Sequence, residues 1–311
     1  MILRRLGMIV PMMVIASFLT FSLVLLIPGD PATRIAGESA TPEQVEQVAR
    51  DLGLDKPFLV QYANFVQGAV TGDLGTSYTY NVPVATMLKE RLPVTLSLTM
   101  VALLFALLLG IPLGVIAGRY AGRLPDRVAT GLTTLGLAVP NFALGLLMIQ
   151  ILAVERGMFP ATGYRPMSEG LGEWFIRLVL PGLALSMIVA AEIARQLRAS
   201  IADTLRQDYM RTATAKGLSA PTKLFKHSMR NALMPVVTVL GMQIAYLLGG
   251  TAVIEAVFGI SGLGDFAVQA VLGRDLPAIQ GIILFAVMVT LVMSLIVDIS
   301  YGYLNPKVRR S

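Results

Sequence analysis

The chain has 311 residues, of which 55% are hydrophobic and only 14% are charged, and its formal net charge is +6. An average soluble domain carries about 25% charged residues, so this composition argues against a soluble protein. The chain has no cysteine, which excludes disulfides, thiolate metal sites and a cysteine nucleophile, and its single histidine argues against a histidine-based metal cluster.

Hydrophobic residues gather in long runs that contain no charged residue or histidine. Five of these runs exceed the roughly 20 residues that cross the hydrocarbon core of a membrane. A shorter run, Leu178–Ala191, is expected to continue through Glu192 towards Leu197. We therefore predict an all-α membrane protein with six transmembrane helices. The five long runs are Leu6–Ile27, Val94–Gly118, Val128–Val154, Ala232–Ile254 and Leu276–Val297.

The positively charged residues lie mainly on one side of the predicted spans. With the N-terminus inside, the inner segments hold sixteen of the 25 Lys and Arg residues, whereas most acids fall in the outer segments. This asymmetry follows the positive-inside rule and predicts that both termini are cytoplasmic. Because topology explains the isoelectric point near 9.7, the basic surface needs no nucleic-acid partner.

The first run, Leu6–Ile27, is too long for the apolar core of a signal peptide and ends without a clear cleavage site, so we predict an uncleaved first span. The outer segment after it contains the helix-start pattern Thr41-Pro42-Glu43-Gln44, and Gly53 suits the end of that helix. A second helix, with aromatic residues on one side, is predicted over Pro57–Val70, followed by a turn at Gly72–Gly75. The segment is either a small helical cap or a docking surface for an external partner.

Small residues mark the second run. Gly110, Gly114 and Gly118 recur at four-residue spacing, which lets a neighbouring helix approach closely. We interpret this stripe as a packing surface. Pro112 lies inside the same run and is expected to bend the helix, as membrane helices tolerate.

Three amide side chains lie inside the predicted spans. Asn141 follows Pro140 in the third run, where the proline interrupts the backbone hydrogen bonds. Asn141 is expected either to pack within a kink or to face a water-filled path, because polar side chains are tolerated there. Gln150 in the third run and Gln243 in the fifth allow the same two interpretations.

Acidic residues lie within or at the ends of three spans. Glu192 has Arg195 three residues later, so a local ion pair is the favoured interpretation. Asp298 has no basic neighbour within one helical turn and is expected to pair with another span or to lie in interfacial water. Glu255 lies at the outer end of the fifth run, before the glycine-rich stretch Gly259–Gly264, which predicts a tight re-entrant turn or loop.

The most polar long segment is the inner loop that leads into the fifth run. A helix from about Leu205 is expected to end at Gly217, and a second short helix from Ser219 to about Met234 is expected to follow it. The loop is either a basic face for anionic lipid or a rigid contact for a cytoplasmic subunit. The chain has no G-x-x-x-x-G-K-[ST] phosphate loop, so nucleotide must bind to a partner.

These residues together resemble the membrane permease subunits of bacterial ABC importers, in the dipeptide, oligopeptide and nickel group. The strongest match is the loop DYMRTATAKGL…KHSMRNALMPVV, which is similar to the EAA loop of such permeases. Arg211 and Thr212 depart from the general EAA pattern, and Ser261 stands where the group usually has proline. Weaker matches in the same order are GDLGTS at 72–77, PV at 83–84, GIPLG at 110–114, VPNF at 139–142, FPATGY at 159–164 and E-x-VF…GLG at 255–264.

The resemblance implies a type I ABC importer permease fold in the bacterial inner membrane. It implies a second homologous permease, usually a different chain, two cytoplasmic ABC ATPase subunits, an external solute-binding protein and surrounding lipid. No cofactor is expected on this chain, and ATP with Mg²⁺ is expected on the ATPase subunits. The boundaries would be 1–27 for the N-terminus and first span, 28–93 for the outer segment, 94–303 for a five-helix core with coupling loop 203–231, and 304–311 for a cytoplasmic tail.

The residues and the resemblance together give three sets of candidate site residues, none of them catalytic or metal-binding. The coupling set would transmit motion from the ATPase, the pathway set would line the translocation path, and the outer set would form the gate or contact the binding protein. The coupling set is Asp208, Tyr209, Arg211, Thr212, Ala213, Lys216 and Gly217; the pathway set is Asn141, Gln150, Gln243 and Asp298; the outer set is Asp73, Glu255, Gly262 and Gly264.

Short peptides are the favoured substrate, and nickel or glutathione is the alternative within the group. An ion-coupled secondary transporter would place ionisable groups near the membrane midplane, where this chain offers only Asn and Gln. An intramembrane enzyme would need a nucleophile with a base, paired acids or a metal, and the residues suggest none of these.

Overall fold

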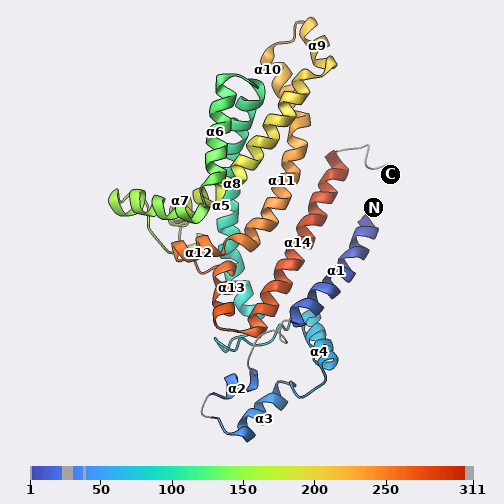
Figure 1. The fold of residues 1–311 in the computed structure, drawn as a ribbon, viewed down its shortest axis with the longest axis vertical. Helices are drawn as coiled ribbons and strands as arrows, with labels where there is room; N and C mark the ends of the chain where they lie inside the picture. The colour runs from blue at the N-terminus through green and yellow to red at the C-terminus, as the bar shows by residue number, and fades with distance from the viewer. Residues whose placement is uncertain (1, 23–30, 38–39, 305–311) are drawn as a thin grey trace. The chain divides into compact units, whose positions relative to one another are not determined.

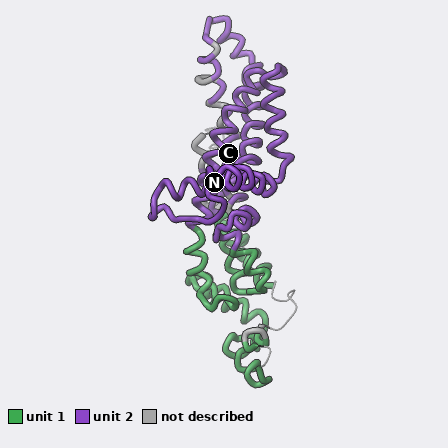
Figure 2. Tube along the Cα trace, turned by 90° about the vertical axis from the view of Figure 1, so that its left-hand side faces the viewer, with its two compact units in different colours: residues 1–92, 266–291 green, residues 93–265, 292–311 purple. Residues whose placement is uncertain are grey.

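The computed structural model describes residues 2–22, 31–37 and 40–304, and the described residues are mostly helical (Figure 1). They fall into two compact units, which Figure 2 colours separately. Unit 1 comprises residues 1–92 and 266–291, and unit 2 comprises residues 93–265 and 292–311.

Unit 1 contains α1 (Ile2–Ser22) and α4 (Phe58–Thr71), which pack through aromatic side chains. The rings of Phe18 and Tyr62 meet edge to face with centroids 5.3 Å apart, and Phe21 lies 5.4 Å from Phe65. Such pairs add about 0.5–1.5 kcal/mol beyond the area they bury. The predicted aromatic side of α4 is therefore confirmed, and its partner is α1, which lies in the predicted first span.

The outer segment of unit 1 also contains α2 (Pro31–Ala36) and α3 (Pro42–Asp51), which contact each other. The capping box at the start of α3 is confirmed, because the Thr41 hydroxyl accepts from the Gln44 N–H and the Gln44 side chain accepts from the Thr41 N–H. Gly53 follows this helix with a positive φ of 67°. Among the described contacts, the residues of α3 are exposed or half-buried.

Unit 2 is built around α8 (Leu171–Arg206), which supplies many of its buried side chains. The glycine stripe of α5 (Val84–Arg119) lies against this helix: a Cβ on Gly110 would lie 2.7 Å from the Ala190 carbonyl oxygen, and one on Gly118 would lie 2.8 Å from Cβ of Ile201. The packing interpretation of the stripe is confirmed. The helix α5 continues through Pro93 and Pro112.

The third hydrophobic run does not form one helix. It is divided into α6 (Leu124–Ala138) and a second piece made of α7 (Asn141–Met148) and the π-helix η2 (Ile149–Glu155), and the two pieces are bent by 95°. The break lies at Val139 and Pro140, which have extended backbone. Proline at this position lacks an N–H and disfavours helix in the residue before it, so the chain turns there. Figure 1 shows α7 running across the direction of α6 and α8.

The fifth run also ends earlier than expected. The helix α11 (Met229–Gly250) stops before Thr251, and α12 (Ala252–Phe258) and α13 (Leu263–Leu272) follow, bent by 93° relative to each other. The predicted turn at Gly259–Gly264 is confirmed, since Gly259 ends α12 with a φ of 59°. The last long helix is α14 (Leu276–Leu304).

Within the described residues, three helices are long and apolar enough to cross a membrane: Val84–Arg119, Leu171–Arg206 and Leu276–Ile296. Counting each of two bent pairs as one span raises this number to five, and Gly7–Ser22 is a shorter apolar helix. Residues 23–27 of the predicted first span lie outside the described residues.

Candidate functional site

The predicted coupling loop follows the C-terminal end of α8. Gln207 has extended backbone, with φ −66° and ψ 149°, and it separates α8 from α9 (Asp208–Ala215). Leu205 therefore belongs to α8 rather than to the loop helix, which corrects the predicted start. The helix α9 ends where expected: the N–H of Gly217 bonds to the Thr214 carbonyl at 3.0 Å, and Gly217 has a φ of 74°.

One side chain anchors α9 and most of the others point to the exterior. Met210 is buried, whereas the predicted coupling residues are exposed, except for the half-buried Ala213. Arg211 lies 3.6 Å from the Asp208 carboxylate, and both side chains are almost fully exposed. An exposed pair of this kind contributes little to stability, so both charges remain accessible to a partner. The exposed coupling residues are Asp208, Tyr209, Arg211, Thr212, Lys216 and Gly217.

The second half of the loop differs from the prediction. The expected short helix ending near Met234 is wrong, because α10 (Ala220–Thr222) and the π-helix η4 (Lys223–Ser228) lead directly into α11. Pro235 lies early in α11 without ending it. The Lys223 ammonium donates to the Thr214 hydroxyl at 2.9 Å, which ties this continuous helix back to α9. The loop thus contains one separate short helix, α9, followed by a longer helix that continues into α11.

A buried carboxylate organises the predicted outer turn in unit 2. Oε1 of Glu255 accepts hydrogen bonds from the hydroxyls of Thr95 and Thr251, each at 2.8 Å. Oε2 accepts from the backbone N–H of Asp265 at 2.9 Å, and Thr95 in turn accepts from the Leu263 N–H at 2.8 Å. These bonds join α5, α12 and the start of α13. Glu255 is completely buried, and both of its carboxylate oxygens accept hydrogen bonds, as a buried polar group requires.

Two glycines of the turn are required by this close packing. A Cβ on Gly262 would lie 2.5 Å from the Thr95 hydroxyl oxygen and would also collide with the Glu255 carboxylate. A Cβ on Gly264 would lie 2.5 Å from Cα of Ala252. The three residues of the outer set that belong to unit 2 are therefore neighbours. Their close packing and hydrogen bonds hold the turn in one conformation.

Replacing Glu255 with glutamine is expected to destabilise this turn by about 2 kcal/mol, because an amide donor would face a backbone N–H or a hydroxyl donor on one of its two sides. Limited proteolysis and the unfolding temperature of the detergent-solubilised protein measure the loss. Glutamine at the exposed Glu90 is the matched control. Equal stability of the two variants would contradict the assigned role of Glu255.

Asp73, the remaining member of the outer set, is exposed and lies in the turn of unit 1. Its carboxylate accepts from the Gly75 N–H at 2.9 Å, and Gly72 and Gly75 both have positive φ. The predicted turn at Gly72–Gly75 is therefore confirmed.

Sequence reasoning missed a second buried carboxylate, Asp275 of unit 1. It accepts from the Ser77 hydroxyl, from the Tyr78 N–H at 3.1 Å and from the Thr79 N–H at 3.2 Å, and so fixes the loop that follows the turn. Burial raises the pKa of Tyr78, and the Asp275 charge adds to this rise. A sequence signal was present, since Asp275 precedes α14 and accepts from the Ala278 N–H as a helix N-cap.

The predicted pathway residues lie in different settings within unit 2. Asn141 begins α7 and is half-buried, whereas Gln150 is exposed on η2 and donates to Glu155 at 3.1 Å. The amide oxygen of Gln243 on α11 is buried and has no hydrogen-bond partner among the described residues. Asp298 is on α14, and its side chain lies outside the described residues. No contact among these side chains is described, so their pathway role stays a prediction.

The local ion pair predicted within α8 is confirmed, because the Arg195 guanidinium contacts the Glu192 carboxylate. In the part of the chain that the structure describes, no group of His, Asp and Glu is placed to hold a metal ion.

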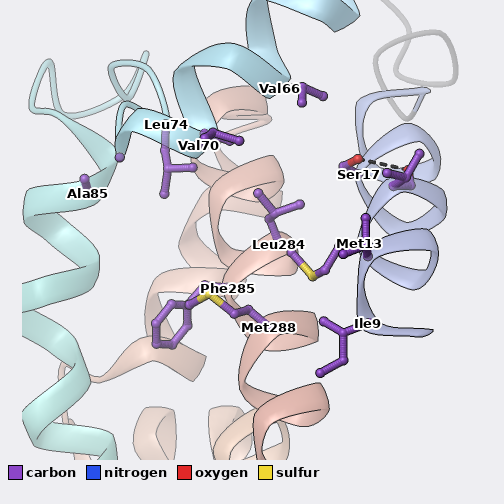
Figure 3. Close-up of a pocket in the computed structure, with 14 residues that line it drawn as sticks. Ile9, Met13, Ser17, Val66, Val70, Leu74, Ala85, Leu284, Phe285 and Met288 are labelled. Carbon is purple, nitrogen blue, oxygen red and sulfur yellow. Dashed lines mark hydrogen bonds between the residues drawn. The ribbon is translucent and has the colours of Figure 1, made fainter. Parts of the chain in front are cut away.

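Unit 1 contains a hydrophobic pocket of about 590 Å³ between α1, α4, the start of α5 and α14. Figure 3 shows Ile9 and Met13 of α1 facing Leu284 and Met288 of α14 across it. Ser17 is the polar side chain of this lining, and its hydroxyl already bonds to the Val14 carbonyl and to the Tyr62 hydroxyl, both at 2.9 Å. The lining suits hydrocarbon, so this pocket is not a candidate path for a polar substrate.

The long apolar helices are those of a helical membrane protein. The buried carboxylates of Glu255 and Asp275 fix two of its loops through hydrogen bonds. Two family models together match most of the chain. The model described as "binding-protein-dependent transport system inner membrane component" matches residues 110–310, and that of the corresponding N-terminal membrane component matches residues 1–99.

Relatives match over nearly the whole length. A putative peptide transport system permease protein of Brucella abortus (strain 2308) is 40% identical over 309 residues, covering 99% of this chain and 98% of that protein. The glutathione transport system permease protein GsiC of Escherichia coli (strain K12) is 40% identical over 308 residues, with the same coverage. A chain of the MetNI methionine ABC transporter, in inward-facing conformations, is similar in fold with a TM-score of 0.58 and 19% identity, covering 70% of this chain and 96% of that one.

The chain belongs to the family of inner-membrane permease components of binding-protein-dependent ABC transport systems, in its dipeptide, oligopeptide and nickel group. The resemblance inferred from the sequence is confirmed. The family consists of permease subunits rather than enzymes.

Proposed function

We propose that this chain forms half of the translocation path of an ATP-driven importer for short peptides. The observation that carries the proposal is the 40% identity to a peptide transport permease across 99% of the chain. The identity extends over the apolar helices, the outer segment and the predicted coupling loop, rather than over one motif.

Six transmembrane helices, with both termini in the cytoplasm, fit the charge asymmetry of the sequence. In this arrangement the segment 28–93 and the Glu255 turn face the exterior, and the loop 203–231 faces the cytoplasm. The five-helix core would comprise residues 94–303 and the tail residues 304–311. This topology puts the exposed face of α9 on the side where ATP is available.

The coupling loop would dock on one of two cytoplasmic ATPase subunits, which hydrolyse ATP with Mg²⁺. The exposed charges of Arg211 and Lys216 suit acidic groups on that partner. Gly217 has a positive φ, which glycine adopts without strain, and so the chain can turn there at the end of α9. A second permease would complete the path, with Asn141, Gln150, Gln243 and Asp298 as its candidate lining. Of the outer set, the exposed Asp73 would be accessible to an external binding protein, whereas the buried Glu255, Gly262 and Gly264 would keep the outer turn of unit 2 in its shape.

Glutathione is the second candidate substrate, because a named glutathione permease is equally similar over the same length. Purification of the complex with its binding protein from native membranes, followed by identification of the bound cargo, separates the two. Recovery of short peptides with this chain supports the proposal. Recovery of glutathione alone would replace peptides with the second candidate.

A further inference from the structure

An ion pair near the C-terminal end of α8 joins this helix to the first turn of α6, just after the turn between α5 and α6. Arg198 of α8 donates from Nε to Oδ1 of Asp126 at 2.5 Å and from Nη2 to Oδ2 at 2.8 Å. The Asp126 side chain is only 4% exposed, whereas that of Arg198 is 41% exposed. A two-bond fork of this kind fixes the orientation of both partners, beyond bringing their charges together.

The same carboxylate also holds its own turn. Asp126 accepts from the Gly122 N–H at 2.7 Å and from the Thr130 hydroxyl at 3.2 Å. Gly122 has a φ of 83°, so the turn between α5 and α6 depends on this residue. Each carboxylate oxygen accepts two bonds, which leaves the buried charge well satisfied.

The glycine stripe adds a second attachment at the same level. A Cβ on Gly118 of α5 would lie 3.0 Å from the Arg198 carbonyl oxygen. The ends of α5 and α6 are therefore held against α8 by backbone packing and by the ion pair. Figure 1 shows these three helices side by side in unit 2, with α9 beyond the end of α8.

The position of the pair along α8 gives it mechanical importance. From Arg198 the helix continues to Arg206, a rise of roughly 12 Å at 1.5 Å per residue. Gln207 then leads directly into α9. Two other polar contacts between helices of unit 2, that of Thr95 with Glu255 and that of Lys223 with Thr214, do not involve α8. A force applied at α9 thus reaches the Asp126–Arg198 pair within about two turns of helix.

We propose that Asp126 and Arg198 are positioning residues of energy coupling, which make α5, α6 and α8 move as one body when α9 is displaced. The inference rests on the proposed function, because it requires α9 to receive force from an ATPase. Without the pair, α8 would move while the α5–α6 turn lags behind. ATP would still be hydrolysed, but less of its free energy would reach the path.

The test uses the complex with its co-purifying ATPase, permease and binding-protein subunits, reconstituted in proteoliposomes. The measured quantity is the amount of labelled alanyl-alanine taken up per ATP hydrolysed. Asp126→Asn and Arg198→Gln are each expected to lower this ratio at least about fivefold, the lower end of typical coupling effects. The double variant is expected to be no worse than either single one, because the two residues act as a unit.

Two further variants make the result decisive. Glu192→Gln removes another ion pair of α8, which lies within that helix and joins no second helix, and is expected to leave the ratio unchanged. Arg198→Lys keeps the positive charge but cannot form both hydrogen bonds that the guanidinium donates to Asp126. Its ratio of uptake to ATP hydrolysis tests the inference if Asp126→Asn yields too little complex. A purely structural pair would reduce assembled complex, hydrolysis and uptake together, so an unchanged ratio in Arg198→Lys and Arg198→Gln overturns the inference. Absence of ATP-dependent uptake by the wild-type complex would instead overturn the proposed function.

Discussion

Replacing Gly217 with aspartate or leucine is expected to abolish ATP-driven uptake while membrane insertion stays intact. The chain itself has room for a side chain there, since nothing lies within 4 Å of a Cβ built on Gly217. Its φ of 74° costs an ordinary residue roughly 1–2 kcal/mol, too little to unfold the chain. Loss of uptake with normal insertion would therefore point to a surface outside the chain, on the ATPase. Uptake and ATP hydrolysis by reconstituted vesicles measure the uncoupling.

Gly217→Asn is the matched control for backbone strain. Asparagine tolerates positive φ and carries no charge, so this variant is expected to keep more activity than the leucine variant, which is strained, and the aspartate variant, which is charged. Normal uptake in vesicles that carry Gly217→Asp would contradict the coupling role of the loop.

Gly114→Leu is expected to prevent stable packing of α5 on α8. A Cβ at this position would already lie 2.7 Å from Cβ of Leu197 and 2.8 Å from the Ala194 carbonyl oxygen, and backbone atoms cannot yield as a flexible side chain can. Overpacking of a close-packed contact costs about 1–3 kcal/mol and occasionally more. The yield of monodisperse protein in detergent and its unfolding temperature should both fall sharply.

Gly131→Leu provides the comparison for this variant. Gly131 lies on α6 and is exposed, and a Cβ built there meets nothing within 4 Å. The two variants add the same side chain to helices of the same unit, so their difference reports helix packing alone. If both variants retain wild-type stability, the close α5–α8 contact is not the arrangement that the folded protein adopts.

Local sequence patterns predicted much of the fold. The capping box at Thr41, the end of α9 at Gly217 and the glycine stripe of α5 were all predicted, because each depends on spacing within a few residues of one helix. The ion pair of Glu192 and Arg195 was predicted for the same reason.

The features that were missed depend on residues far apart in the chain. Asp126 and Arg198 are separated by 72 positions, and Asp275 and Ser77 by 198, so no helical periodicity relates them. The length of the apolar run 128–154 predicted one span, but it carries no information on the 95° bend at Pro140. Proline kinks and proline breaks look alike in sequence, because the packing around them decides between the two. The proposed substrate path would likewise be formed by residues far apart in sequence, so local patterns do not identify its lining.

The most direct test of the central claim is uptake of labelled alanyl-alanine by the reconstituted complex with its two possible energy sources separated. ATP is supplied on the side of the ATPase subunits, and a protonophore collapses any proton gradient. If the chain is the permease half of an ATP-driven peptide importer, uptake continues without the gradient and stops when ATP is withdrawn. Uptake that collapses with the proton gradient while ATP is maintained would contradict the account and indicate an ion-coupled transporter.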